Sequence, residues 1–169
     1  TRVLIIIVGG AVVFYMIGSL FTAIFSRTFS QRMTIGNSLL LLFAWSIAGF
    51  IMGLDTISNK IYSGIGAWWF VGLLVGGLVT GFTFMRLSPM IRWPQMLLIT
   101  LSWVLGALPA LFMAGVGSAV NVGYGYRDIP YTHNLQSGML TGAVNGGLTL
   151  LVLYFANRKI KKPKSKVAA

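Results

Sequence analysis

The sequence predicts an all-α integral membrane protein with five transmembrane helices. Of its 169 residues, 56% are hydrophobic and 9% are charged, and the mean hydropathy is +0.83. A soluble domain has about 25% charged residues. The hydrophobic residues gather in five long stretches, each close to the roughly 20 residues that a helix needs to cross a bilayer. A glycine pattern that occurs in two of these stretches predicts close helix packing.

The residues that could carry out chemistry are few. Thirteen lysines and arginines stand against two acidic residues, Asp55 and Asp128, which gives a formal net charge of +11. There is no cysteine, and His133 is the only histidine. The sequence therefore offers no carboxylate pair, thiolate or cluster of metal ligands. We expect no catalytic residues, no metal site and no enzyme activity.

The five predicted helices form one transmembrane domain, residues 1–157. They cover about residues 3–25, 35–54, 64–85, 95–115 and 137–157. The first apolar stretch is longer than the 7–15 residues or so of a signal-peptide core, and Arg27 and Arg32 follow it as a stop signal would. We interpret it as a retained helix. Residues 158–169 form a basic tail that favours an anionic membrane surface.

The basic residues also predict orientation, because lysine and arginine in short loops accumulate on the cytoplasmic side. Ten of the thirteen lie on the side that includes the tail, whereas Arg2, Lys60 and Arg127 lie on the other side. The N-terminus is therefore predicted outside and the C-terminus in the cytoplasm, in a bacterial inner membrane. Trp45 and Trp103 lie well inside their spans, so we expect both to pack between helices.

The last four helices are predicted to form two tandem hairpins. Residues 72–78, GLLVGGL, correspond to residues 142–148, GAVNGGL, and aligning Trp45 with Trp103 matches the helices that precede them. Both hairpins would start and end on the same side. This is a parallel duplication, unlike the inverted repeats of many secondary transporters. Such small-residue-rich hairpins resemble a general style of bacterial polytopic protein, which identifies no activity.

The first helix could belong to a third hairpin. It contains Gly9 and Gly10, and it runs in the same direction as the third and fifth predicted helices. The sequence therefore leaves open that a further helix precedes Thr1.

Two glycine ridges are the predicted helix-packing positions. Residues four apart share one helix face, and glycines there let another backbone approach closely. Packing within each hairpin is the first interpretation, and a groove for a partner helix, a lipid tail or a flat pigment ring is the alternative. The ridges contain Gly72, Gly76, Gly77, Gly81, Gly138, Gly142, Gly146 and Gly147.

Three residues mark a candidate polar contact or ligand site inside the helices. Asn145 lies where the other hairpin has Val75, and its amide needs a partner in hydrocarbon. We expect that partner to be Ser102, Thr100 or a freed carbonyl of the fourth helix. Pro109 should kink that helix just beyond Gly106. A substrate contact or a broken transport helix is the alternative.

The predicted outer loop, residues 116–136, is the densest polar and aromatic segment. At about twenty residues it is longer than a simple hairpin turn, and docking to a neighbouring protein is the preferred interpretation. His133 as a ligand of haem or chlorophyll is an alternative that no spacing motif supports. The docking candidates are Tyr124, Tyr126, Arg127, Asp128, Tyr131 and His133.

Two function classes remain. The first is an accessory or scaffold subunit of a respiratory or photosynthetic complex, with membrane lipids and other integral membrane subunits as partners, a bound lipid expected and a pigment allowed. The second is a small transporter, channel or substrate-binding subunit for a neutral or hydrophobic solute. No predicted helix interior contains a charge, and buried charges mark most ion and solute pathways, which favours the first class. No cofactor can be identified, and nucleic-acid binding is not expected.

Overall fold

The computed structural model describes residues 2–29, 33–54, 67–109 and 131–158. All regular secondary structure in these segments is helical. The described helices are α1 (Arg2–Thr28), α2 (Ile35–Gly53), α4 (Ala67–Leu87), α5 (Trp93–Leu105) and α7 (Tyr131–Arg158).

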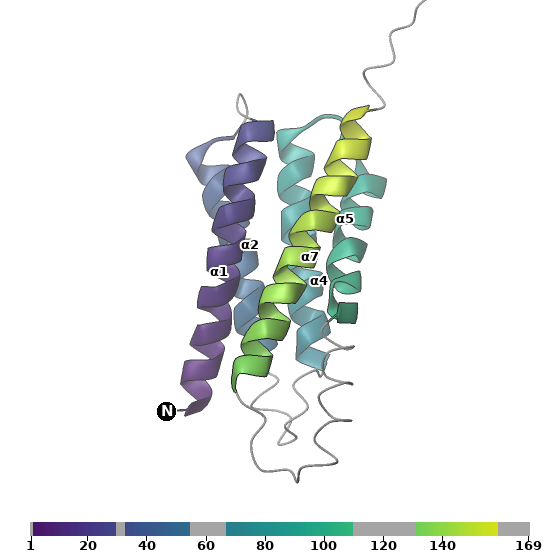
Figure 1. Ribbon diagram of the computed structural model, residues 1–169. Helices are drawn as coiled ribbons and strands as arrows, with labels where there is room; N and C mark the ends of the chain where they lie inside the picture. The colour runs from purple at the N-terminus through teal and green to yellow at the C-terminus, as the bar shows by residue number, and fades with distance from the viewer. Residues whose placement is uncertain (1, 30–32, 55–66, 110–130, 159–169) are drawn as a thin grey trace, which may run out of the picture.

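The helices form a bundle in which neighbours along the chain run in opposite directions (Figure 1). Helix α1 packs on α2, α2 on α4 and α4 on α5. Helix α7 runs obliquely across the bundle and contacts both α5 and α1, which closes the ring of contacts. The C-terminal ends of α1, α4 and α7 therefore lie at the same end of the bundle as the start of α5. We call this the basic end, because Arg27, Arg86 and Arg92 lie there.

Local signals explain where two helices begin. Thr34 precedes α2, and its hydroxyl accepts a hydrogen bond from the Asn37 backbone N–H at 3.3 Å. At the start of α5, the Gln95 side chain accepts a bond from the Arg92 backbone N–H at 3.0 Å, and Pro94 fits the first turn, which requires no N–H donor. A short turn from Ser88 to Arg92 thus joins α4 to α5.

Four of the described helices are long and apolar enough to cross a membrane. The apolar segments are Ile7–Thr28, Ile35–Gly53, Ala67–Leu87 and Gly138–Ala156. The described apolar part of the remaining helical segment, Trp93–Pro109, is shorter. Its predicted span continues over residues 110–115, which lie outside the described residues. The prediction of a helical membrane protein is confirmed in part: the described residues form only helices, and four to five apolar helices could span a membrane, where five spans were predicted.

Two helices extend beyond the predicted transmembrane spans. Helix α1 continues to Thr28 and includes Arg27, which the sequence had placed in a loop. A basic residue in the last turn interacts favourably with the helix dipole, so it need not end the helix. Helix α7 begins at Tyr131 instead of residue 137. The hydropathy pattern located its apolar part, whereas backbone hydrogen bonds extend a helix through polar residues as well.

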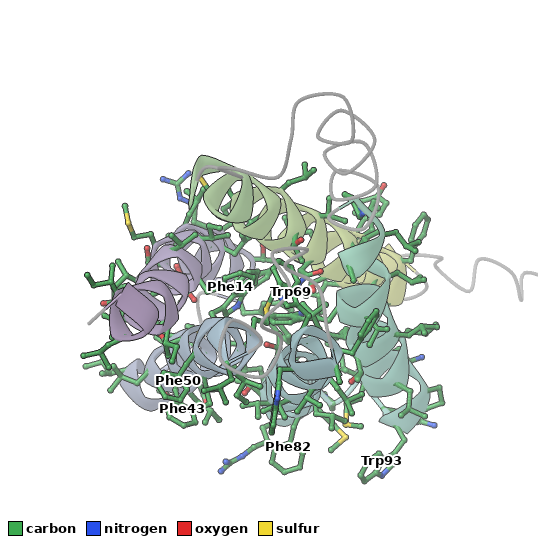
Figure 2. The ribbon with its side chains drawn as sticks, turned by 90° about the horizontal axis from the view of Figure 1, so that it is seen from below. Phe14, Phe43, Phe50, Trp69, Phe82 and Trp93 are labelled. Carbon is green, nitrogen blue, oxygen red and sulfur yellow. The ribbon has the colours of Figure 1, made fainter. Side chains whose placement is uncertain are left out.

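The bundle is apolar inside and outside. Trp45, Leu73, Phe84 and Trp103 are fully buried within one hydrophobic core. Outward-facing positions hold large hydrophobic side chains, and Figure 2 shows Phe43, Phe50, Phe82 and Trp93 projecting away from the helices. An apolar surface on every side is unusual for a soluble protein but expected where lipid is the solvent.

Candidate functional site

Two tryptophans contact each other in the centre of the bundle. The rings of Trp45 on α2 and Trp103 on α5 have centroids 4.6 Å apart and are fully buried. On its α1 side, Trp45 stacks on Phe21 with a centroid distance of 5.7 Å and an interplanar angle of 4°. Phe14 approaches the same ring at 6.1 Å. The expectation that both tryptophans pack between helices is confirmed, and the pair connects α1, α2 and α5.

Trp103 also joins α5 to α7 through hydrogen bonds. Its indole N–H donates to Thr149 Oγ1 at 3.2 Å, and the Thr149 hydroxyl donates to the Asn145 backbone carbonyl at 2.7 Å. When the Asn145 amide is oriented with its nitrogen towards acceptors, Nδ2 donates to the Trp103 carbonyl at 3.1 Å and to the Thr141 carbonyl at 3.2 Å. We call this group, Trp103, Thr141, Asn145 and Thr149, the α5–α7 seam.

Asn145 fills the seam because Gly106 makes room for it. A β-carbon on Gly106 would overlap the Asn145 side-chain amide. Helix α5 ends at Leu105, Gly106 interrupts the pattern, and residues 107–109 form a further helical turn. Asn145 has no exposed surface. The amide is thus enclosed by α5 and by its own helix.

The residues predicted as partners of the Asn145 amide do not bind it through their side chains. The Ser102 hydroxyl donates to the Ile99 carbonyl at 2.7 Å, and the Thr100 hydroxyl donates to the Met96 carbonyl at 3.0 Å, so both satisfy their hydroxyls within α5. The Asn145 amide instead reaches a backbone carbonyl of α5. Pro109 is half-buried in the helical turn after Gly106.

The glycines of α4 lie against two neighbouring helices. A β-carbon on Gly72 would lie 2.7 Å from the Ala48 carbonyl oxygen of α2. One on Gly76 would lie 2.8 Å from Ala48 Cβ and would also meet the Trp103 ring of α5. Gly77 and Gly81 face α5, where a β-carbon would lie 2.9 Å from Thr100 Cα and 2.8 Å from Met96 Cγ, respectively. Each position leaves no space for a side chain.

The glycines of α7 differ from one another. A β-carbon on Gly142 would lie 2.7 Å from Ile17 Cδ1, and one on Gly146 would overlap the Phe21 ring, so these two face α1 and not the hairpin partner α5. Gly138 is looser, with Phe14 at 3.8 Å. No described atom lies within 4 Å of a β-carbon on Gly147.

The predicted docking loop is only partly described. Tyr131 and His133 lie in the first turns of α7, so the prediction that they belong to a loop was wrong. Pro130 precedes them in the sequence, and proline is favoured at helix starts. Residues Tyr124, Tyr126, Arg127 and Asp128 lie outside the described residues, as does the tail after Arg158.

The described side chains include no buried charge. Arg27, Arg86 and Arg92 are all exposed at the basic end. Within the described segments, no group of three or more histidine, cysteine or acidic residues could bind a metal. Comparison of the chain with protein-family models, with curated proteins and with solved structures gives no match. Interpretation of the site therefore depends on its geometry alone.

Some buried positions were not identified from the sequence. Gly10 of α1 and Gly49 of α2 lie backbone to backbone, and a β-carbon on Gly10 would be 2.8 Å from the Gly49 carbonyl oxygen. Gly18 packs directly on Trp45. Near the basic end, Phe25 of α1 meets Phe84 of α4 edge to face at 4.8 Å. In the sequence, these positions are marked only by a glycine or an aromatic residue at helical spacing. Most apolar helices contain that pattern, so it did not distinguish these residues.

Proposed function

We propose that this chain is a non-catalytic integral membrane protein that serves as an accessory or scaffold subunit of a larger membrane complex. The observation that carries the proposal is the packing of Asn145. This amide is the most polar of the buried side chains among the described residues, and it is enclosed against Gly106 with its donors directed at two backbone carbonyls. A transport site would leave such a group available to a solute. Here it joins two helices instead.

The outer face of α7 supports the same proposal. Gly147 has no described neighbour within 4 Å of a β-carbon position, and Ala143, one turn earlier on that face, is exposed. Two small residues four apart allow close approach of another transmembrane helix. A helix of a neighbouring subunit fits this position, and a lipid tail or a pigment ring would use the same flat surface.

The proposed topology places the basic end in the cytoplasm, in a bacterial inner membrane. The exposed arginines at that end and the lysine-rich tail support it. We also propose that α2–α4 and α5–α7 are duplicated hairpins. In this alignment Trp45 corresponds to Trp103 and Ala48 to Gly106, while Val75 and Val79 correspond to Asn145 and Thr149. The contact between α2 and α4 in the first hairpin would then correspond to the α5–α7 seam, with valines in place of its polar residues.

The test is gentle detergent extraction of native membranes, native-gel separation, and mass spectrometry of the proteins, lipids and pigments that migrate with the chain. An accessory subunit migrates in a large assembly with defined partners. Migration as a monomer or a small homo-oligomer contradicts the proposal.

A transporter of a neutral solute is the second candidate. Buried hydroxyls on several helices favour it, because a neutral solute needs no buried charge. Purified protein in liposomes would then accelerate entry of a neutral solute, and substitution of Asn145 or Pro109 would reduce that rate. Equal rates with and without the protein would exclude this candidate for each solute tested.

A further inference from the structure

Four buried polar atoms have no hydrogen-bond partner among the described residues. They are the hydroxyls of Thr22, Thr80 and Thr141 and the indole N–H of Trp45. Thr22 is 7% exposed and the other three residues are 0% exposed. Native proteins rarely leave buried polar groups unpaired, and bound water is a common explanation where such groups occur.

These threonines differ from other buried threonines of the bundle. Thr83, Thr100 and Thr149 each donate the hydroxyl to a carbonyl one turn earlier in their own helix, at 2.7, 3.0 and 2.7 Å. This bond is available to any helical threonine by rotation of its side chain. The hydroxyls of Thr22, Thr80 and Thr141 do not make this bond.

Two of the four groups lie next to the aromatic contact at the basic end. Phe25 and Phe84 meet across the bundle at 4.8 Å. Thr22 precedes Phe25 on α1 by about one turn, and Thr80 precedes Phe84 on α4 by about one turn. Because α1 and α4 run in the same direction, both hydroxyls lie on the same side of the Phe25–Phe84 contact.

The other two groups lie close to the same level. Trp45 stacks on Phe21, which immediately precedes Thr22, and its ring also packs on Gly18. Thr141 immediately precedes Gly142, which packs on Ile17, the residue before Gly18. Measured along α1, the four polar groups therefore fall within about two helical turns.

Buried aromatic side chains lie on both sides of Thr22 and Thr80 along the bundle. Phe25 and Phe84 lie towards the basic end. Towards the opposite end, the buried side chains of Phe14 and Trp69 point into the middle of the bundle, as Figure 2 shows. The polar groups themselves are buried in the interior of the bundle.

We propose that Thr22, Trp45, Thr80 and Thr141 bind small neutral hydrogen-bonding molecules inside the bundle. The ligands are water molecules, or small uncharged solutes that replace them, because two helical turns are farther than one such molecule reaches. The ligand next to Trp45 must accept a bond from the indole N–H, and each ligand can both donate to and accept from the hydroxyls. No described charged group lies there to attract an ion. This site is independent of whether the chain works in a larger complex.

The first test uses the full chain with ¹⁵N-labelled tryptophan in lipid nanodiscs. Trp45→Phe assigns the Trp45 indole signal, and Trp103, whose N–H already has Thr149 as acceptor, is the internal reference. We expect a magnetisation-transfer cross-peak between the Trp45 indole proton and water, and none for Trp103. Repeating the experiment with glycerol identifies the ligand: cross-peaks to glycerol indicate a solute site, and unchanged water cross-peaks indicate a water site. A Trp45 signal without any cross-peak overturns the proposal.

The second test compares two threonines of α4. Thr80→Val removes a proposed ligand contact at nearly constant volume, whereas Thr83→Val removes a hydroxyl that bonds to its own helix. We expect Thr80→Val to shift the Trp45 indole signal and to lower the thermal midpoint by about 2–4 °C, the shift typical of one lost contact in a protein of this size. Thr83→Val leaves the Trp45 signal in place. An unchanged or raised midpoint for Thr80→Val indicates a dry interior and overturns the proposal.

Discussion

The Asn145 side-chain amide occupies the space beside Gly106 that a β-carbon would fill. The two residues belong to different helices, α7 and α5, and neither could be enlarged without moving the other. The same amide reaches carbonyls of Trp103 and Thr141 when its nitrogen faces them. Helix packing and hydrogen bonding at the α5–α7 seam therefore depend on one glycine.

Replacement of Gly106 by alanine should weaken the seam. The added methyl group displaces the Asn145 amide, and overpacking of this kind costs about 1–3 kcal/mol. The free energy of unfolding can be measured by titrating the detergent-solubilised protein with sodium dodecyl sulfate and following helix content by circular dichroism.

The control for Gly106→Ala is a double-mutant cycle with Asn145→Ala. If the two residues compete for the same space, the double variant should be more stable than the sum of the two single effects predicts. Purely additive effects on the free energy of unfolding would show that Gly106 and Asn145 do not compete for the same space.

The hydrogen bond from Trp103 to Thr149 should contribute only modestly. Thr149→Val removes the acceptor of the indole N–H at nearly constant volume, and interhelical hydrogen bonds of this type average about 0.6 kcal/mol. The same unfolding titration, combined with Trp103→Phe, isolates the pair. A coupling energy of zero would mean that the bond makes no net contribution in the folded protein.

Gly77 and Gly147 occupy matching positions in the two proposed hairpins, but their surroundings differ. Gly77→Ala should destabilise the bundle by about 1–3 kcal/mol, because its β-carbon would lie 2.9 Å from Thr100 Cα. Gly147→Ala should be neutral or stabilising by up to about 1 kcal/mol, since alanine is the better helix former and no described atom is in the way. The free energy of unfolding of each variant is measured by the same detergent titration. Equal losses at the two positions would contradict this assignment.

The helices could be predicted from sequence because their signal is additive. Each apolar segment contributes many hydrophobic side chains, so single polar residues such as Thr80 or Asn145 do not obscure the pattern. Helix ends are decided by local interactions instead. The Gln95 side chain that caps α5 and the dipole interaction available to Arg27 act through one or two groups. Hydropathy does not detect these contributions.

The contacts of the site were harder to predict than its residues. The sequence indicated that Asn145 needs a partner and that Trp45 and Trp103 are buried. It did not indicate that Gly142 and Gly146 face Ile17 and Phe21 of α1, because the position of α7 depends on how the ring of helices closes. The four unpartnered polar groups likewise come from four different helices, so only their packing brings them to one level.

The proposed topology can be tested directly because the chain has no native cysteine. Met90 is 40% exposed in the turn between α4 and α5, at the basic end, so Met90→Cys should be labelled by a membrane-impermeant maleimide only after the cells are opened. Asn59→Cys, between the second and third predicted spans on the side opposite the basic end, should be labelled in intact cells. The basic residues predict this result because lysine and arginine are retained on the cytoplasmic side. Labelling of Met90→Cys in intact cells, with Asn59→Cys protected, would invert the topology and place the arginines of the basic end outside.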